Sequence, residues 1–207
     1  MNGQTATEER FNSLTHLLGT IAALIGLILL IRQQTDPWKL ISFSIFGSTM
    51  VLLYSISTLY HAMSGQNKRI LRKLDHLAIY ILIAGTYAPF TLVTLRNNWG
   101  WPVFGLVWGL AIIGIIIDLL PNKKGQRTIP IIIYLLMGWM ALILAKPLLD
   151  NLPLNGFIWL LCGGLFYTFG LIFYGFDARV PFFHTIWHLF VLAGSFFHYL
   201  AVYRFIA

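Results

Sequence analysis

Charged residues and cysteines are scarce in this 207-residue chain. Only 10% of its residues are Asp, Glu, Lys or Arg, whereas 58% are hydrophobic. Soluble domains usually carry about 25% charged residues, so this chain has too little polar surface to cover a soluble globule. The composition argues against a soluble enzyme, a nucleic-acid-binding module and a disordered chain. The single cysteine, Cys162, excludes an intramolecular disulfide framework and a cysteine-rich zinc site.

Long apolar runs recur along the sequence. A bilayer core about 30 Å thick needs roughly 20 apolar residues in a helix, and backbone groups cannot stay unpaired in lipid. Strands of a β-barrel would instead alternate with a period of two. The sequence therefore predicts an all-α, polytopic membrane protein, in which residues 1–207 form a single domain built as a seven-transmembrane-helix bundle. The expected helices cover residues 13–31, 40–62, 74–95, 101–120, 129–145, 155–175 and 183–205.

Prolines separate most of these runs. Seven of the eight lie between runs or at their edges, Pro121 among them, whereas Pro89 lies well inside the third run and predicts a kink there. The first run follows Glu8-Glu9-Arg10 rather than a basic leader, and no small-residue cleavage site follows it. We therefore expect a retained helix and not a signal peptide.

Basic residues are distributed unevenly between the two sets of connecting segments. One set of alternate segments carries nine Lys and Arg residues and the other carries five. Because Lys and Arg in short loops mark the cytoplasmic side, we expect a multi-pass protein of a cell membrane with a cytoplasmic N-terminus and an external C-terminus. The net charge of +7 then faces anionic lipid and requires no nucleic acid. The richer set comprises Arg10, Lys68, Arg69, Arg72, Lys73, Lys123, Lys124, Arg127 and Arg179.

Ionisable residues within the apolar runs gather at one depth. Such residues are costly in a membrane and are functional candidates by default. With the predicted orientation, one carboxylate and five of the six histidines lie at the cytoplasmic ends of their helices. Only His198 lies deeper, about 15 Å further along its helix, and we expect it to be a helix-packing hydrogen-bond partner. The layer contains His16 at the start of the first helix, His61 at the end of the second, Asp75 and His76 at the start of the third, and His184 and His188 at the start of the last.

The spacing of these residues points to a metal ion. His184 and His188 are four residues apart and project from one helical face, and His61 is the candidate for a third ligand. Three imidazoles with water in the fourth position are typical of a catalytic zinc site, whereas four protein ligands close a structural one. Asp75 is placed to orient a ligand, hold the water or accept its proton. Ser57, one turn deeper than His61, is a candidate oxyanion donor.

Each feature also has an explanation without a metal. A histidine pair near a membrane interface is often incidental. Asp75 is equally suited to cap the third helix, and Ser57 to bond the carbonyl one turn back. Their common depth favours a shared site, because chance does not readily place every candidate in one layer.

Four motifs resemble those of a known family. Residues 9–16, ERFNSLTH, are similar to the E-x-x-N-x-x-T-H opening of the hemolysin III group of the progestin and adiponectin receptor (PAQR) family. Residues 57–61, STLYH, resemble its S-x-x-x-H element, and residues 184–188, HTIWH, resemble its H-x-x-x-H element. Residues 75–90 resemble its D-H-x-x-I-Y…I-A-G-T-Y-x-P-F stretch. The motifs occur in the family's order and extend over essentially the whole chain.

The resemblance implies a fold, a metal and a substrate class. It implies seven helices with a cytoplasmic N-terminus, and Zn²⁺ held by His61, His184 and His188. Ser57 and Asp75 match the remaining site positions of the family. The bacterial members are named for haemolysis and linked to membrane lipid homeostasis, and relatives cleave the lipid amide ceramide. For Asn12, Thr15 and His16 we expect a supporting role around the metal ligands.

Three functions are compatible with these residues. The first is a membrane-embedded zinc amidohydrolase acting on a ceramide-like membrane lipid, with Asp75 and Ser57 as catalytic residues. The second is a non-enzymatic membrane sensor or regulator with structural zinc. The third is a lytic pore, which only the family name suggests, because most spans lack a polar stripe. The sequence leaves the oligomeric state open.

Overall fold

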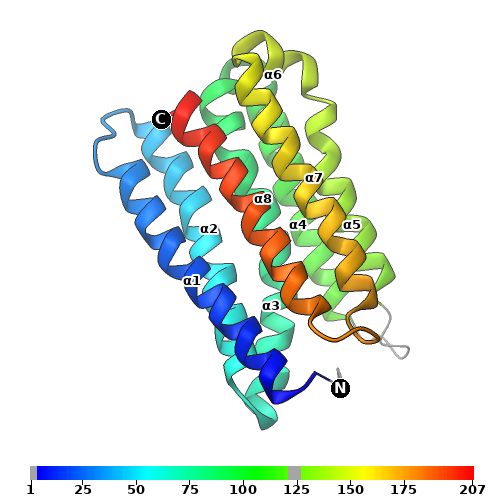
Figure 1. Ribbon diagram of the computed structural model, residues 1–207. Coiled ribbons are helices and arrows are strands. Elements are labelled where there is room, and N and C mark those ends of the chain that lie inside the picture. Colours follow the sequence, from blue (N-terminus) through cyan, green and yellow to red (C-terminus); the bar gives the residue numbers. More distant parts are fainter. Residues whose placement is uncertain (1–3, 121–126) are drawn as a thin grey trace.

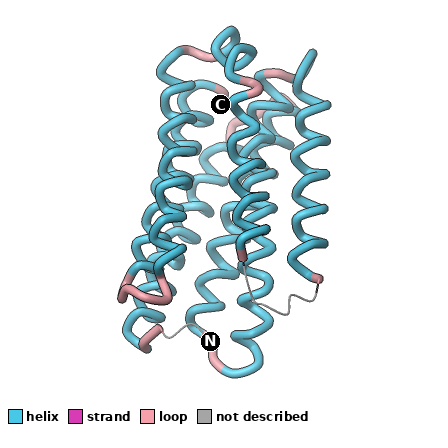
Figure 2. Tube along the Cα trace, turned by 90° about the vertical axis from the view of Figure 1, so that its right-hand side faces the viewer, coloured by secondary structure: helices cyan, strands magenta, loops and turns pink. Residues whose placement is uncertain are grey.

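The computed structural model describes residues 4–120 and 127–207, and every regular element in these ranges is helical (Figures 1 and 2). Pro121, Lys123 and Lys124 lie outside the described residues. The start of α1 and the C-terminus lie at opposite ends of the bundle in both views. The α-helices are α1 (Ala6–Ile31), α2 (Pro37–Ala62), α3 (Gly65–Pro89), α4 (Trp101–Leu119), α5 (Thr128–Trp139), α6 (Ala145–Asn151), α7 (Leu154–Phe176) and α8 (Phe183–Phe205).

The helices have the length and composition of membrane spans. Six are long and apolar enough to cross a bilayer, and the bent pair α5–α6 makes a seventh if it is counted as one span. Large apolar side chains are exposed on outer faces, as Leu18 and Ile25 are on α1 and Ile116 is on α4. Lipid is the solvent that such faces fit. The chain is therefore a multi-pass helical membrane protein, as its composition predicts.

Two helices, α1 and α3, begin about two helical turns before the apolar runs that predict them, at residues 6 and 65 instead of 13 and 74. Helix α1 begins at Ala6 because Thr5 and Glu8 form a capping box, in which each side chain bonds the other's backbone N–H. Only two residues separate the end of α2 from Gly65, where α3 begins. Gly65 has a φ of 64°, which suits a residue without Cβ, and the chain reverses its direction there. His16, Asp75 and His76 therefore lie inside their helices, and the prediction that they open them is wrong.

The basic segment before Asp75 is helix rather than loop. Lys68, Arg69, Arg72 and Lys73 lie in the first turns of α3, where their polarity ended the apolar run that hydropathy detects. Since Asp75 lies well inside α3, it does not cap that helix.

Pro89 ends the regular part of the third helix. It lacks the N–H that an α-helix needs at this position, and the chain continues as π-helical turns, η1 (Phe90–Thr94) and η2 (Arg96–Gly100). A Cβ at Gly100 would overlap the carbonyl oxygen of Thr91, so the turn into α4 requires glycine there. The predicted kink is thus a break in the α-helical hydrogen bonding.

The fifth run is not one straight helix. Helix α5 ends at Trp139, a 3₁₀ turn, η3 (Met140–Leu142), follows, and α6 begins at Ala145, with a bend of 46° across the break. Pro147 lies in the first turn of α6. Backbone N–H groups in the first turn of a helix have no acceptor within the helix, so the N–H that proline lacks costs no hydrogen bond there. The run continues to Asn151 and is therefore longer than the predicted 129–145.

Helices α7 and α8 pack closely because glycines line their contact. A Cβ at Gly163 would overlap the His198 ring and lie 3.0 Å from the carbonyl oxygen of Gly194. The neighbouring Gly164 has nothing within 4 Å of the same position. The two glycines therefore face different environments on one helix.

We expect Gly163→Ala to destabilise the protein by about 1–3 kcal/mol, because the added methyl group must displace a ring and a backbone carbonyl. Gly164→Ala is the matched control and should be neutral or stabilising by about 0.5–1 kcal/mol, since alanine favours a helix over glycine. Unfolding of both variants in detergent micelles measures the difference. Equal stability of the two variants would contradict this account of the packing.

Candidate metal centre

Three buried imidazoles from distant parts of the chain converge at the end of the bundle where α1 begins. His61 lies in the last turn of α2, whereas His184 and His188 lie in the first two turns of α8. One ring nitrogen from each lies within 4.8 Å of the other two, and the residues are 3%, 7% and 2% exposed. The cluster is positioned to bind a metal ion.

Two carboxylates orient two of these rings. His61 Nδ1 lies 2.7 Å from Glu9 Oε2, and His184 Nδ1 lies 2.7 Å from Asp177 Oδ2. A carboxylate that accepts from Nδ1 fixes the tautomer with a free Nε2 and raises its basicity as a ligand. The buried His61 Nε2 has no hydrogen-bond partner within the described structure, and such an orphaned nitrogen fits a metal ligand.

The third ring is held by α1. His188 Nδ1 lies 3.2 Å from the Asn12 carbonyl oxygen and 3.3 Å from Thr15 Oγ1. Asn12 Oδ1 also accepts from Thr185 Oγ1 on α8 at 2.5 Å. Asn12 and Thr15 therefore contact the candidate ligand His188, in the place that a supporting role requires. All three imidazoles thus engage Nδ1 and keep Nε2 for a common ion.

Loss of Glu9 should weaken metal binding about 10- to 100-fold, as is usual when a group that orients a histidine ligand is removed. Glu9→Ala removes the partner of His61 Nδ1. Lys68→Ala is the control, because Lys68 forms the other ion pair of Glu9, at 2.9 Å, without touching the ring. Competition with a chromophoric chelator measures the affinities. If both variants bind like the parent protein, Glu9 does not orient the ligand.

His16 belongs to the cluster but not to the ligand set. Its ring stacks on His188 with centroids 3.6 Å apart and planes 10° apart. Imidazole binds a metal along a lone pair in the ring plane, so two stacked parallel rings cannot share one ion. Both ring nitrogens of His16 are buried without a hydrogen-bond partner among the described residues. His16 therefore does not supply a fourth ligand.

Ser57 and Asp75 face the cluster across a small cavity. The cavity has a volume of about 40 Å³, and its lining includes Ser57, Asp75, His16, His184 and His188. That volume is enough for a water molecule. Ser57 Oγ is buried, does not bond the carbonyl one turn back, and lies next to the Asp75 carboxylate. Its hydroxyl is available to a molecule in the cavity.

His76 lines the same cavity but is held by another network. Its Nδ1 accepts from Arg127 Nη1 at 2.7 Å. Arg127 also donates to both carboxylate oxygens of Asp118 at 3.1 Å and to Tyr134. These contacts join α3, α4 and α5 beside the candidate site, and they commit His76 to packing.

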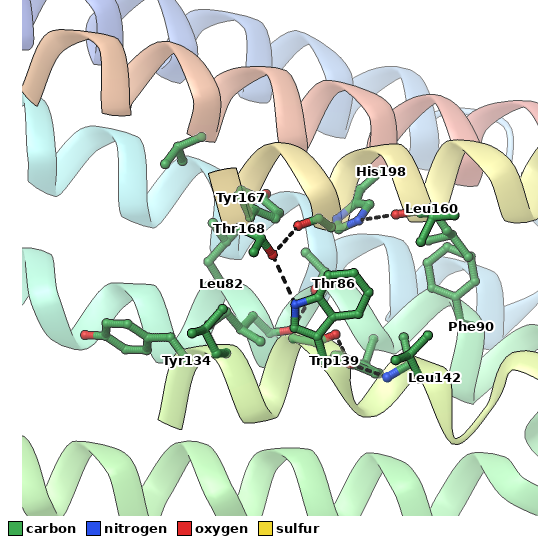
Figure 3. Close-up of a pocket in the computed structure, with 18 of the residues that line it drawn as sticks. Leu82, Thr86, Phe90, Tyr134, Trp139, Leu142, Leu160, Tyr167, Thr168 and His198 are labelled. Atoms are coloured by element: carbon green, nitrogen blue, oxygen red, sulfur yellow. Dashed lines mark hydrogen bonds between the residues drawn. The ribbon is translucent and has the colours of Figure 1, made fainter. Parts of the chain in front are cut away.

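A larger apolar cavity adjoins the histidine cluster. It has a volume of about 160 Å³ and lies among α3, α5, α7 and α8 (Figure 3). Trp139 Nε1 donates to Thr168 Oγ1 at 3.0 Å beside it, and His198 Nε2 donates to the Leu160 carbonyl oxygen at 3.2 Å. His198 is thus a helix-packing partner, as its depth predicts. Leu53, Ile79, Trp187 and Val191 line both cavities.

The sequence did not reveal the two orienting carboxylates. Glu9 stands in the first motif, but nothing local shows that it reaches His61 on another helix. Asp177 stands in the sequence between the last two apolar runs, and only the turn before α8 brings it to His184. A carboxylate close before a histidine pair is the one signal that points to Asp177.

Comparisons with known proteins agree with these motifs. The family model described as "Haemolysin-III related" matches residues 4–199. "Hemolysin-3" of Bacillus cereus is 41% identical over 93% of this chain and 89% of its own length. "Hemolysin-3 homolog" of Bacillus subtilis (strain 168) is 43% identical over 92% and 91%. "Monocyte to macrophage differentiation factor" of Homo sapiens is 31% identical over 98% and 86%.

Proposed function

Because the chain belongs to the haemolysin III-related proteins of the PAQR family, we propose that it is a zinc-dependent lipid amide hydrolase embedded in the membrane, with a ceramide-like substrate. One observation carries the proposal: two of the three clustered imidazoles, His184 and His188, line a cavity together with the Ser57 hydroxyl and the Asp75 carboxylate. A purely structural site would be closed by a fourth protein ligand, and the stacked His16 cannot supply one.

The donor set fits zinc. Three neutral imidazole nitrogens with an open fourth position are the arrangement of catalytic zinc sites, and each ring has its Nδ1 engaged by another group. His61, His184 and His188 would hold the ion. Zinc bound in this way acidifies a water molecule and polarises a carbonyl group.

Asp75 and Ser57 would supply the remaining chemistry. The Asp75 carboxylate accepts the proton of a water molecule in the 40 Å³ cavity and transfers it to the leaving amine. The Ser57 hydroxyl donates a hydrogen bond to the oxygen of the amide carbonyl, where negative charge develops. Most of the side chains that line the cavity, Ser57 among them, are buried, which limits competition from bulk water.

The adjoining cavity would accept the lipid tail. Its lining is almost entirely apolar, and it shares four residues with the cavity that holds Ser57 and Asp75. An acyl chain in this space brings its carbonyl group to the histidine cluster without leaving an apolar environment. Helices α5 and α7 border the space, and a lipid can enter between them from the bilayer.

The proposal places the enzyme in a bacterial plasma membrane. Among the described residues, seven Lys and Arg lie at the end of the bundle that contains the histidine cluster and five lie at the other end, which favours a cytoplasmic N-terminus and an external C-terminus. Two Bacillus proteins are among its relatives. The bent pair α5–α6 then counts as one span, which gives seven crossings.

Purified protein in lipid vesicles tests the function. We expect zinc-dependent release of fatty acid from ceramide-like amides, lost on treatment with a chelator and regained with zinc. Bound zinc without turnover of any lipid amide in a broad panel would favour the sensor or regulator. Conductance of the same preparation across planar bilayers would favour a pore.

A further inference from the structure

The turn between α7 and α8 contains an unusual backbone conformation. Phe182, directly before α8, has φ 62° and ψ 0°. Within residues 4–120 and 127–207 it is the one non-glycine residue with positive φ. A bulky side chain disfavours this conformation, which persists only where the surroundings hold it. Whatever fixes Phe182 also fixes the start of the helix that carries His184.

A buried carboxylate on α1 contacts this turn. Glu8 Oε1 accepts from the Phe182 N–H at 2.8 Å. Glu8 Oε2 accepts from the backbone N–H and the hydroxyl of Thr5 at 2.7 and 2.8 Å. Glu8 is only 6% exposed, and its charge stands at the N-terminus of α8, where the helix dipole favours an anion.

The contact is the first of a series along the two helices. One turn after Glu8, Asn12 accepts from Thr185 through its side chain, and its carbonyl oxygen lies 3.2 Å from His188 Nδ1. Glu8 thus contacts Phe182, and Asn12, four residues later, contacts Thr185 and His188 on α8. These contacts, which begin at Phe182, fix the first two turns of α8 relative to α1, both in rotation about the helix axis and in position along it.

We propose that Glu8 is a positioning residue for the histidine cluster. By holding Phe182 in the left-handed conformation, it sets the start of α8 and thereby the direction in which His184 and His188 face His61. Glu8 acts through Phe182 and touches none of the three rings. The inference rests on the proposed metal site for its functional meaning.

Four variants separate positioning from general stability. Glu8→Ala should weaken zinc affinity about 10-fold, the lower range for a group that orients ligands. Glu8→Gln should keep most of the affinity, because its amide oxygen still accepts from the Phe182 N–H. Phe182→Gly should bind like the parent protein, because glycine adopts positive φ freely. Added to Glu8→Ala, it should restore the affinity.

Thr5→Ala is the matched control, because it removes a hydroxyl partner of Glu8 without touching Phe182. It should lower the melting temperature but leave zinc affinity unchanged. Parent-like affinity of Glu8→Ala, or no recovery in the double variant, would overturn the inference. If Glu8→Ala does not fold, the double variant Glu8→Ala/Phe182→Gly decides the question. We then expect the double variant to fold and bind zinc, and its failure to do so would overturn the inference.

Amide hydrogen exchange in the first turn of α8 supplies a metal-free readout. Exchange should be faster in Glu8→Ala than in the parent protein and should slow again when Phe182→Gly is added. If the parent binds no zinc, the metal proposal fails, while this exchange pattern still supports the role of Glu8. Unchanged exchange in Glu8→Ala would refute that role even if the parent binds zinc.

Discussion

Replacing His188 by alanine should leave the purified protein almost without zinc. The substitution removes one of three imidazole ligands, and the two that remain, His61 and His184, form an incomplete site. Because removing a mere orienting group weakens binding about 10- to 100-fold, loss of a ligand should exceed 100-fold. Metal analysis should fall from about one zinc ion per chain to near none. His184→Ala should give the same result.

His198→Ala is the control for this experiment. His198 lies on the same helix and is half-buried, but it bonds the Leu160 carbonyl oxygen and is not part of the cluster. It should keep the parental zinc content even if it destabilises the packing of α7 and α8. Equal zinc content in His188→Ala, His184→Ala and the parent protein would remove the metal site from the account.

Replacing Asp75 by asparagine should abolish most lipid amide hydrolysis while zinc stays bound. Asparagine is nearly isosteric but cannot accept the proton of the attacking water, and general base catalysis contributes about 10²- to 10⁴-fold. We therefore expect a fall of that size in kcat. Zinc content should not change, because Asp75 lines the cavity and is not among the three clustered ligands.

Asp118→Asn is the matched control for Asp75→Asn. It makes the same chemical change on α4, outside the 40 Å³ cavity. Asp118 pairs there with Arg127 at 3.1 Å, in the network that also holds His76. Its kcat should stay within a few-fold of the parent, although its stability should fall. Turnover that is equally insensitive to both substitutions would reject Asp75 as the base and leave the zinc site standing.

Much of the architecture follows from composition and hydropathy alone. Continuous apolar runs identify the membrane helices because lipid demands internally satisfied backbone. The starts of α1 and α3 were missed for a physical reason: their first turns are polar, and a hydropathy run ends where charge begins. Only the capping box of Thr5 and Glu8 marks the true start of α1 in the sequence.

The candidate site was partly predictable because its residues share one depth in the membrane. The spacing of His184 and His188 places them on one helical face, and His61 ends its helix in the same layer. The carboxylates of Glu9 and Asp177 were not predictable in this way. Their role depends on the rotation of neighbouring helices about their own axes, and no pattern within a single helix contains that information.

The role of His16 could not be predicted from the sequence either. Its depth and its motif place His16 near the other histidines. Only the structure shows that its ring stacks on a candidate ligand, His188, and is not itself placed as a ligand. The stack on His188, with planes 10° apart, is what argues for an open site. A zinc site with an open fourth position is typical of enzymes, whereas four protein ligands close a structural site.

X-ray absorption at the zinc K-edge of the purified protein would identify the ligands of the bound ion. We expect three imidazole nitrogens at about 2.0–2.1 Å, with an oxygen in the remaining position. Each of His61, His184 and His188 should contribute one nitrogen, so the imidazole signal should fall in any single alanine variant that retains metal. Absence of zinc, or a first shell with fewer than three imidazoles in the parent protein, would contradict it.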